Sequence, residues 1–554
     1  MHSVYCTLPS KKRIELDYGT RVSEVIRREE EFAVPPRPII AALVNNELVS
    51  LSFKIEISST LEPVSLDSEV GMRIYRNSLS FLLSRAVSEL YPRRKLIIGH
   101  SLGHGYYFYF DSEEEVSAGD LESIKKRMRE IVSRNEAIIR RVISYGEALD
   151  YFMKTGHHSR VELLRFRNEA KIPVYESGEH REIGYQPLVQ STGLLNLFEL
   201  KPYSPGFLLR YPSSSAPDRV AAFSDNPVLF SVFMEYKAWG KILNVNSVGK
   251  LNRLVESQKI GEFIQVAEAL HNKKIASIAD RIAERRGTVR AVMIAGPSSS
   301  GKTTFTKKLG IQLKVLGFNP IAISLDDYFV PREQTPLDEK GDYDFEALEA
   351  IDIELLNRHL INLLKGEEIE IPLFDFKTGN RRPSGKHLKL NRRSILLMEG
   401  IHGLNDALTP QVDPAAKYKV YVSALTQLNL DDRNRIPTTD NRLLRRMVRD
   451  HQFRGHSALR TLQMWPSVRR GEDRNIFPYQ NNADSAFNSA LDYELAVLKN
   501  YAETLLRTVK PYHTEYAEAM RLTSFLHNFI GIPDREVPRD SILREFIGGS
   551  KFHY

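Results

Sequence analysis

The part of the chain after Arg290 is marked by short apolar runs that alternate with helix-like patterns. The runs that read as strands are "AVMIAG" (291–296), "NPIAISLDD" (319–327), "RSILLMEG" (393–400) and "KYKVYVSA" (417–424). Between them, the spacing of apolar residues predicts one helix from Lys302 and another from about Phe345 to Leu364. Because parallel strands need crossover connections, this alternation predicts an α/β fold, a parallel sheet with helices on both faces.

The first sixty-odd residues follow a different pattern, in which short strand-like runs dominate. "VYCTLP" and "RIELDYG" flank a turn at "SKK", "TRVSEVIRREEEF" has helical spacing, and "IIAALVNNELVSLSF" reads as two strands around Asn45-Asn46. A hairpin, a helix and further strands in that order predict a β-grasp domain.

A second region, from about Gly71 to Tyr211, carries long helical patterns such as "NSLSFLLSRAVSELY" and "DLESIKKRMREIVSRNEAIIRRV". The Pro/Ser-rich stretch "PSSSAPD" then separates it from another helical pattern, "KIGEFIQVAEALHNKKIASIADRIAERRG". We therefore expect four parts: a β-grasp domain at 1–65, an α+β domain at 66–215, a helical linker at 216–285, and the α/β domain with C-terminal helices at 286–554. A chain of 554 residues is long enough for several domains.

Composition narrows the class of protein without deciding its partner. No apolar run approaches the ~18 residues of a membrane span, and the N-terminus lacks the apolar core of a signal peptide, so a cytoplasmic protein is expected. Cys6 is the only cysteine, which excludes disulfides within the chain and a thiolate metal cluster. The net charge of +7 suits an anionic ligand or RNA, but it is spread over 77 basic and 70 acidic residues.

The strongest motif is a complete G-x-x-x-x-G-K-[ST] match with a strand-like run before it and a helical pattern after it. Its glycines let the backbone curl around phosphate oxygens, and the helix N-terminus adds its positive end. We predict that ATP binds here, with Lys302 on the β- and γ-phosphates and the Thr303 hydroxyl on Mg²⁺. The predicted ATP-binding residues are Gly296, Pro297, Ser298, Ser299, Ser300, Gly301, Lys302, Thr303 and Thr304.

Carboxylates at the ends of two further strands complete the candidate chemistry. Open α/β sheets bind ligands at the carboxyl ends of their strands, and Glu399 ends one such run, so it is the expected Mg²⁺ ligand. Asp326 and Asp327 end another. The motif alone leaves water, a protein or a small alcohol as phosphate acceptor. An aspartate beside the γ-phosphate favours the alcohol, which needs a base to take its proton.

A basic helix follows later in the chain, in "NRLLRRMVRDHQFRG". Arg442, Arg446 and Arg449 fall at i, i+4 and i+7, with Arg445 adjoining, so one helix face is predicted to present guanidinium groups. Such a face either is merely solvated or closes over the triphosphate and neutralises charge during transfer.

Six blocks in the same order resemble the uridine kinase and phosphoribulokinase family of P-loop kinases: "GPSSSGKTT", "SLDDYF", "YDFEALEAIDIELL", "IPLFDF", "LLMEGIHGL" and "RLLRRMVRDHQFRG". The resemblance implies transfer of the ATP γ-phosphate to a hydroxyl, the 5′-hydroxyl of uridine or cytidine in the nearest members. It implies that Asp326 is the general base, also placed to contact the metal, and that Asp344 holds the ribose hydroxyls. It further implies catalytic roles for Lys302, Arg446 and Arg449, phosphate contact by Arg454, and an acceptor pocket at Phe329, Tyr343 and Phe374.

The chain departs from this family at the acceptor. Phe374 stands where the nearest uridine kinases have tyrosine, and Gly379 stands near their base-contacting histidine. Losing a phenol and an imidazole removes polar contacts that discriminate steeply between bases, so the nucleobase stays open. Arg469, Arg470 and Arg474 are either further contacts or surface charges.

The first 210 residues resemble the TGS and second N-terminal domains of threonyl-tRNA synthetase, through blocks such as "AALVNNELVSLS", "IIGHSLGHGYYFYFD" and "VQSTGLLNLFEL". The family's editing residues correspond here to Asn77, Phe81, Gly184 and Leu188, which cannot do that chemistry, so no tRNA editing is expected. His100 and His104 lie in a Gly-rich loop without an evident third metal ligand. The expected roles of this half are regulation, RNA binding or oligomerisation.

The leading hypothesis is a Mg-ATP-dependent uridine or cytidine kinase that forms a homo-oligomer. Two alternatives stay open: a kinase of another alcohol, such as a sugar phosphate or a pantothenate-like compound, and an RNA-responsive regulator that uses ATP as a switch.

Overall fold

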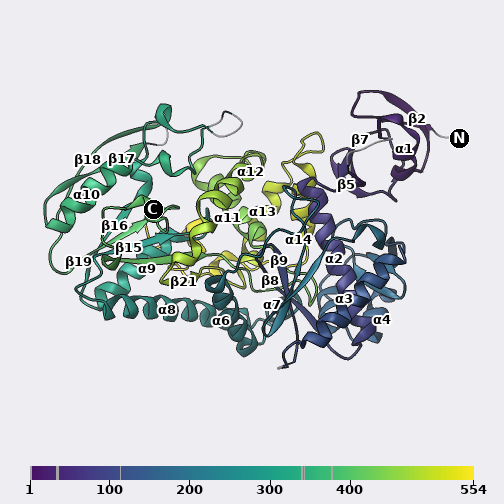
Figure 1. The fold of residues 1–554 in the computed structure, drawn as a ribbon, viewed down its shortest axis with the longest axis horizontal. Coiled ribbons are helices and arrows are strands. Elements are labelled where there is room, and N and C mark those ends of the chain that lie inside the picture. The colour runs from purple at the N-terminus through teal and green to yellow at the C-terminus, as the bar shows by residue number, and fades with distance from the viewer. Residues whose placement is uncertain are drawn as a thin grey trace.

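The computed structural model describes residues 3–32, 37–112, 114–337, 341, 343–375 and 378–553. We refer to residues 3–65 as the N-terminal module, 66–215 as the middle module, 216–285 as the helical segment and 286–553 as the C-terminal module. Figure 1 shows the N-terminal module at one end of the molecule and the parallel sheet of the C-terminal module at the other, with helices α12, α13 and α14 between them.

The N-terminal module is the predicted β-grasp fold. Its main sheet has the order β2-β1-β7-β4-β5, in which β1 and β7 run parallel and the other pairs antiparallel. The Asn45-Asn46 turn has positive φ at both residues, as a two-residue hairpin turn requires. The elements are β1 (Ser3–Thr7), β2 (Arg13–Asp17), β3 (Thr20–Arg21), α1 (Val22–Arg28), β4 (Ile39–Val44), β5 (Glu47–Ser50), β6 (Lys54–Ile55) and β7 (Ser59–Ser65).

The middle module packs helices against two antiparallel sheets, β10-β11-β12 and β13-β14-β9-β8. Two of its helices, α2 and α3, start at side-chain caps: Ser68 accepts a hydrogen bond from the backbone N–H of Gly71, and Ser117 forms a capping box with Asp120. The elements are α2 (Glu69–Leu90), β8 (Leu96–Leu102), β9 (Gly105–Phe110), α3 (Ala118–Ser133), β10 (Ile139–Ser144), α4 (Tyr145–Lys154), α5 (His158–Leu164), β11 (Lys171–Ser177), β12 (His180–Ile183), β13 (Glu199–Tyr203) and β14 (Gly206–Arg210).

The C-terminal module is built on a five-stranded sheet of order β16-β19-β15-β20-β21, and all of its pairings are parallel. Every residue of the central strand β15 is buried, which explains its unbroken apolar sequence. Its strands are β15 (Ala291–Ala295), β16 (Asn319–Ser324), β17 (Ile369–Asp375), β18 (Asn380–Leu388), β19 (Ser394–Glu399), β20 (Lys417–Ser423) and β21 (Ser485–Asn488). Strands β17 and β18 form a separate hairpin.

Helices cover both faces of this sheet, as the sequence predicts. On one face Val292 packs in a core that includes Ile278 of helix α8, and on the other Met293 packs in a core that includes Leu356 of α10. The helices of the last two parts are α6 (Pro227–Leu243), α7 (Val248–Glu256), α8 (Ile260–Glu284), α9 (Lys302–Val315), α10 (Ile353–Lys365), α11 (Thr438–Arg454), α12 (Ala458–Asn475), α13 (Glu494–Leu506), α14 (Tyr516–Leu526) and α15 (Arg544–Ile547). Helix α8 therefore shares the core of the C-terminal module.

One helix boundary differs from the sequence prediction. The apolar spacing places a helix from Phe345, whereas α10 begins at Ile353, after a short 3₁₀ turn at Leu348–Ala350. The side chain of Asp352 accepts a hydrogen bond from the backbone N–H of Leu355 at 2.9 Å. This N-cap fixes the start of the helix, so the residues before it form a loop at the edge of the sheet.

A loop of the C-terminal module, residues 425–437, docks onto the middle module and buries several charges there. The backbone N–H of Ile98 in β8 donates to the carbonyl of Asp432 at 2.8 Å, and the Ser159 hydroxyl donates to the Asp432 carboxylate at 2.5 Å. Arg160 lies 3.1 Å from Glu182 of its own module and 3.7 Å from Asp431 of the loop. Each module supplies part of the charge balance at this interface.

The same interface reaches the start of helix α11. His100, which the sequence places in a Gly-rich loop, lies in strand β8; it is buried, and its Nε2 lies 3.2 Å from the Thr438 hydroxyl. Asp440 accepts two hydrogen bonds from Arg521 of α14, at 2.6 and 2.8 Å. The middle module, through His100, and helix α14, through Arg521, thus hold the first turn of the predicted arginine helix.

Replacing Arg160 tests whether a buried ion pair contributes more to stability than an exposed one. Arg160 is 1% exposed, so Arg160→Met removes the cation that pairs with both buried acids, Glu182 and Asp431, and we expect a loss of about 3–5 kcal/mol in the free energy of unfolding. Arg141→Met is the control, because the Arg141 side chain is 59% exposed although it lies 2.7 Å from Glu176, and its loss should stay below about 1 kcal/mol. Urea unfolding measures both, and equal shifts would contradict this account.

Candidate phosphoryl-transfer site

The phosphate loop, residues 296–301, connects the buried strand β15 to helix α9 and has a backbone that only glycine allows at two points. Gly301 has φ of +81°, a left-handed conformation, where a side chain is strained. A Cβ atom on Gly296 would lie 2.0 Å from the carbonyl oxygen of Val422 in β20. The loop therefore curls close to the sheet, with the N-terminus of α9 at its mouth.

Buried arginines of helix α11 bind the carbonyl groups of this loop from the protein interior. Arg442 of α11 donates to the Ser298 carbonyl at 2.9 Å and pairs with Glu472 of α12, which in turn accepts a hydrogen bond from the Ser298 backbone N–H at 3.1 Å. Burial lowers the pKa of Arg442 to about 9, and the neighbouring cation Arg469 adds to this effect. The Arg442–Glu472 ion pair thus holds both backbone groups of Ser298, with Glu472 on the N–H and Arg442 on the carbonyl.

Arg445 acts in the same way one residue further along the loop. It donates to the Ser299 carbonyl at 3.3 Å and to Ser489, and it pairs with Glu494 of α13. Arg442 and Arg445 are 1% and 0% exposed. The predicted stripe of guanidinium groups is therefore divided, because Arg442 and Arg445 support the loop while Arg446 and Arg449 remain on the side of the site.

Lys302 lies across the mouth of the loop. Its Nζ donates to the carbonyls of Gly296 and Pro297, at 2.9 and 3.1 Å. Burial lowers the pKa of Lys302, and nearby carboxylates, led by Glu399 and Asp326, oppose that change. The lysine is thus held over the loop and surrounded by acids that keep its charge balanced.

Thr303 and Glu399 form the pair that the sequence proposes for Mg²⁺. Glu399 ends β19, and its Oε1 accepts a hydrogen bond of 3.0 Å from the Thr303 hydroxyl. Burial raises the pKa of Glu399 to about 7, with a further increase from Glu545, and Lys302 opposes it. A hydroxyl and a carboxylate are hard oxygen donors of the kind Mg²⁺ prefers, so these residues fit that ion.

Asp326 follows β16 at the same edge of the sheet. Its side chain is exposed, yet the surrounding protein reduces its hydration and so raises its pKa, while Lys302, Arg454 and Arg449 oppose the change. An accessible carboxylate surrounded by three cations is the arrangement expected for a base that meets a substrate.

The arginines at the end of α11 share one acid. The Arg446 guanidinium donates to the Ser298 hydroxyl at 2.8 Å, and it lies 3.3 Å from Asp450. Asp450 is buried and also pairs with Arg449 at 2.8 Å and Arg454 at 3.6 Å. Asp450 thereby gathers three guanidinium groups beside the phosphate loop.

The predicted acceptor residues form an aromatic group with one acid beside it. The rings of Phe329 and Phe374 meet edge to face at 5.6 Å, and Phe345 lies 6.4 Å from Phe329. Tyr343 is exposed and its ring lies 6.1 Å from that of Phe345. The Asp344 carboxylate accepts a hydrogen bond from the backbone N–H of Glu346 at 3.1 Å.

The hairpin β17–β18 carries the positions where the chain departs from uridine kinases. A Cβ atom on Gly379 would lie 2.8 Å from Nε of Arg332, so the arginine side chain covers this glycine. Residues 376 and 377 of the predicted acceptor block lie outside the described residues.

Two acids of the site were missed from the sequence. Burial raises the pKa of Glu346 to about 6, where Arg446 and Lys302 oppose the shift and Asp326 adds to it, so this carboxylate lies among the predicted catalytic residues. Its place in "YDFEALE", two residues after Asp344, is a signal that could have found it. Glu545 accepts hydrogen bonds from Thr304 next to the phosphate loop, and no sequence motif around Glu545 predicts this contact.

Comparison with known proteins assigns the C-terminal module. Residues 291–496 match the Phosphoribulokinase / Uridine kinase family. This part of the chain belongs to that family. Together with the phosphate loop and the parallel sheet, the match makes the C-terminal module a P-loop kinase of small substrates, hereafter the kinase module. A solved structure described as a possible uridine kinase from Bacillus stearothermophilus is 19% identical, with a TM-score of 0.27, and the likeness covers 39% of this chain and 98% of that one.

The N-terminal half matches threonine–tRNA ligases. The enzyme of Maridesulfovibrio salexigens is 32% identical over 193 residues, which cover 34% of this chain and 29% of the ligase. That of Carboxydothermus hydrogenoformans is 36% identical over 162 residues, which cover 29% of this chain and 26% of the ligase. The chain thus spans less than a third of the length of these curated relatives.

The positions that correspond to the editing residues lie inside the middle module. Phe81 is buried, with its ring 5.2 Å from that of His180. A Cβ atom on Gly184 would lie 3.1 Å from the Tyr175 ring. Neither position supplies a metal ligand or an acid–base group.

The pKa of Glu399 predicts a pH dependence of Mg²⁺ binding. Since a carboxylate binds the ion only when deprotonated, the Mg²⁺ affinity of the ATP-saturated protein should fall as the pH drops through about 7. Glu399→Gln should bind Mg²⁺ weakly and with a shallower slope, which comes from protonation of the γ-phosphate alone, whereas Glu349→Gln, an exposed acid of the same module, should keep the slope of the wild type. A Mg²⁺ titration at several pH values measures the slope, and an unchanged slope in Glu399→Gln would refute the assignment.

Proposed function

We propose that the kinase module transfers the γ-phosphate of ATP to the 5′-hydroxyl of a nucleoside, uridine or cytidine. The observation that carries the proposal is the exposed Asp326 carboxylate at the sheet edge of the phosphate loop, with Lys302, Arg449 and Arg454 as its charge neighbours. A carboxylate at this place serves an acceptor that has a proton to lose.

Each group has a part in the proposed transfer. The loop amides bind the α- and β-phosphates, Lys302 binds the β- and γ-phosphates, and Arg454 binds phosphate at the outer edge. Thr303 and Glu399 would hold Mg²⁺, with Asp326 close to it, and the bound ion offsets phosphate charge. Asp326 takes the hydroxyl proton as the acceptor oxygen attacks the γ-phosphorus, and the bond from that phosphorus to the β,γ-bridging oxygen breaks, so that ADP leaves with the bonding electrons. Arg446 and Arg449 stabilise the charge that develops on the transferred group.

The acceptor is proposed to lie against the aromatic group. Phe329 and Phe374 face its base and Tyr343 covers it from the solvent side, while Asp344 and Glu346 accept hydrogen bonds from its sugar hydroxyls. Both acids lie on the loop that links β16 to α10, and the charges of Asp326 and Asp344 both act on Glu346.

One observation favours a different alcohol in the same site. Arg332 lies against Gly379, at the hairpin that carries Phe374. A cation there suits an acceptor with a negative charge of its own, such as a sugar phosphate or a pantothenate-like carboxylate.

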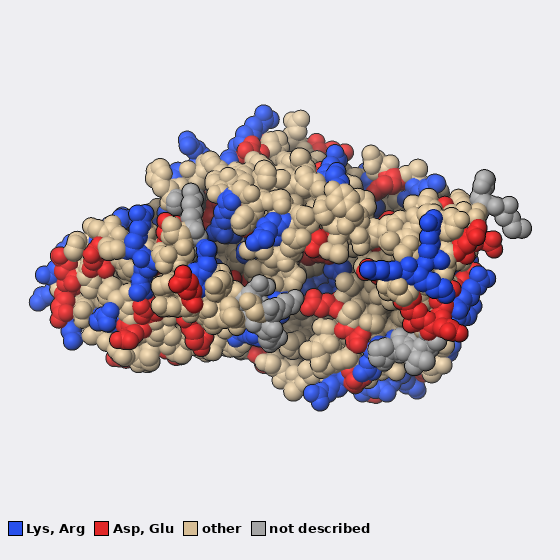
Figure 2. Space-filling view, turned by 90° about the horizontal axis from the view of Figure 1, so that it is seen from above, with Lys and Arg blue, Asp and Glu red and all other residues tan. Residues whose placement is uncertain are grey.

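The remaining expectations concern the whole protein and are kept as proposals. These are the domain division at 1–65, 66–215, 216–285 and 286–554, a cytoplasmic location, a homo-oligomer and an RNA-responsive switch. None of the helices among the described residues has both the length and the apolar character of a membrane span. On the face drawn in Figure 2, basic and acidic side chains are intermingled rather than gathered by sign.

The acceptor class is tested by incubating the protein and Mg-ATP with nucleosides, sugar phosphates and pantothenate, with and without RNA, and reading the mass gain of one phosphate. Phosphorylated uridine or cytidine is expected. A phosphorylated anionic alcohol instead would favour the Arg332 argument, and RNA retention without any product would favour the switch.

Replacing Asp326 tests the mechanism. Asp326→Asn keeps the size of the side chain and removes the base, so the rate of transfer should fall by roughly 10²–10⁴-fold while the Kd for ATP stays close to that of the wild type. The neighbouring Asp327→Asn is the control, because its carbonyl oxygen can still accept the hydrogen bond from the backbone N–H of Phe374. Full transfer activity in Asp326→Asn would exclude Asp326 as the base.

A further inference from the structure

The C-terminal segment, residues 534–553, lies across the phosphate loop. Ile542 is so close to Gly301 that a Cβ atom on the glycine would lie 2.6 Å from its Cγ2. Lys308 of α9 donates to the carbonyl of Asp540 at 3.0 Å, and Lys307 donates to the carbonyl of His553. Figure 1 shows the C-terminus beside the strands of the kinase sheet.

Within this segment, the Glu545 carboxylate occupies the N-terminus of α9. Its Oε2 accepts a hydrogen bond of 3.0 Å from the backbone N–H of Thr304 and one of 2.7 Å from the Thr304 hydroxyl. Thr304 lies in the first turn of α9, where the backbone N–H groups have no carbonyl partner inside the helix. These N–H groups, with those of the loop, are the donors that hold the α- and β-phosphates of a nucleotide.

A carboxylate oxygen on these donors stands where a phosphate oxygen has to bind. The two anions cannot share one N–H and one hydroxyl without strong repulsion, because both carry negative charge within a few ångströms. The negative charge of Glu545 also acts on neighbouring groups of the site. It helps to raise the pKa of Glu399, and it supports the protonated form of Lys302.

We infer that Glu545 is a residue of the donor site that competes with the nucleotide phosphates for Thr304, so that ATP binding displaces the Glu545 side chain. This inference rests on the nucleotide donor of the proposed function, and it is independent of the acceptor. Glu545 thereby sets how tightly the site holds phosphate.

The surroundings of Glu545 indicate that the side chain, and not the segment, gives way. Leu543, Phe546 and Ile547 are buried in the core, whereas Glu545 is only half-buried. Arg544 anchors the segment by donating to the carbonyls of Asp534 and Val537, at 2.7 and 2.8 Å.

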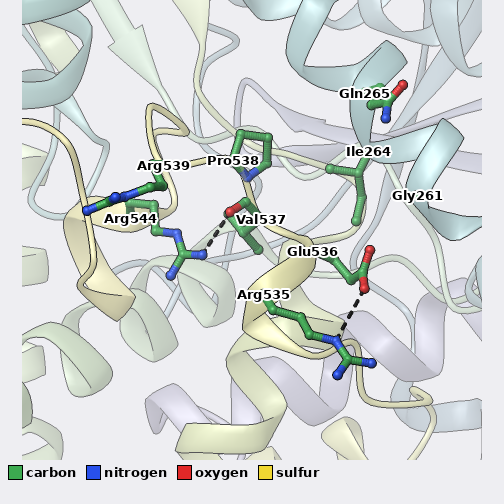
Figure 3. A pocket seen from close by; sticks show the side chains of 9 residues that line it. All are labelled: Gly261, Ile264, Gln265, Arg535, Glu536, Val537, Pro538, Arg539 and Arg544. Carbon is green, nitrogen blue, oxygen red and sulfur yellow. Dashed lines mark hydrogen bonds and ion pairs between the residues drawn. The ribbon is translucent and has the colours of Figure 1, made fainter.

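The other side of the segment lines a cavity, and Glu545 is not among the residues around it. A cavity of about 460 Å³ separates residues 535–539 from helix α8, with Arg544 at its edge (Figure 3). Glu536 lines this cavity and lies 3.5 Å from Arg535. It is an acid of the same segment that does not contact the phosphate loop.

The test compares Glu545→Gln with Glu536→Gln in the full chain, by measuring the Kd of ATP, ADP and adenosine without any acceptor. A glutamine oxygen can still accept both hydrogen bonds from Thr304, so this variant removes the charge alone. We expect Glu545→Gln to bind ATP and ADP about tenfold more tightly and adenosine unchanged, because only the phosphates meet the carboxylate. Glu536→Gln should leave all three Kd values unchanged.

Unchanged or weaker ATP binding in Glu545→Gln, with an unfolding midpoint equal to that of the wild type, would overturn the inference and leave Glu545 as a helix cap. An equal gain for adenosine would overturn it as well, since the effect would not depend on phosphate. If the tighter ATP binding is found but no alcohol is phosphorylated, the inference stands and the proposed acceptor reaction fails. If the wild-type protein binds no nucleotide, both fail.

Discussion

The phosphate loop depends on ion pairs buried beneath it. A turn that aims its N–H groups outward leaves its carbonyls facing the protein, and a buried carbonyl needs a donor. Arg442 and Arg445 supply these donors, and Glu472 and Glu494 balance their charge, so helices α11, α12 and α13 are tied to one short turn. The backbone of the loop is thereby held in place before a phosphate binds, which favours electrostatic catalysis.

Helix α11 therefore has two tasks along its length. Its inward arginines support the loop, and the arginines about one turn further along, at 446 and 449, lie on the side of the site. Its first turn is held by His100 and Arg521, and the loop before it is embedded in the middle module. The part that resembles threonine–tRNA ligase is thus attached to the helix on which the proposed chemistry depends.

Much of the fold follows from local patterns. The apolar run of β15, the Asn45-Asn46 turn and the helix start at Lys302 all appear where the sequence predicts them, because each depends on neighbouring residues only. The predicted start of α10 was wrong, because the N-cap at Asp352 fixes the first turn although the apolar spacing before it also suits a helix. The prediction that the arginines of α11 face the site holds for Arg446 and Arg449 but not for Arg442 and Arg445. Helical spacing shows which residues share a face, and it does not show which neighbouring element covers that face.

The sequence by itself determined the phosphate loop, the carboxylates at the ends of β16 and β19, and the family to which residues 291–496 belong. These signals are carried by short contiguous stretches, in which glycine, lysine and acid positions are fixed by the geometry of one turn. Only the tertiary structure decided that Arg442 and Arg445 are supports, that Glu346 joins the site and that Glu545 reaches Thr304. These contacts join residues up to 241 positions apart, and burial and charge at such a distance depend on how the whole chain packs.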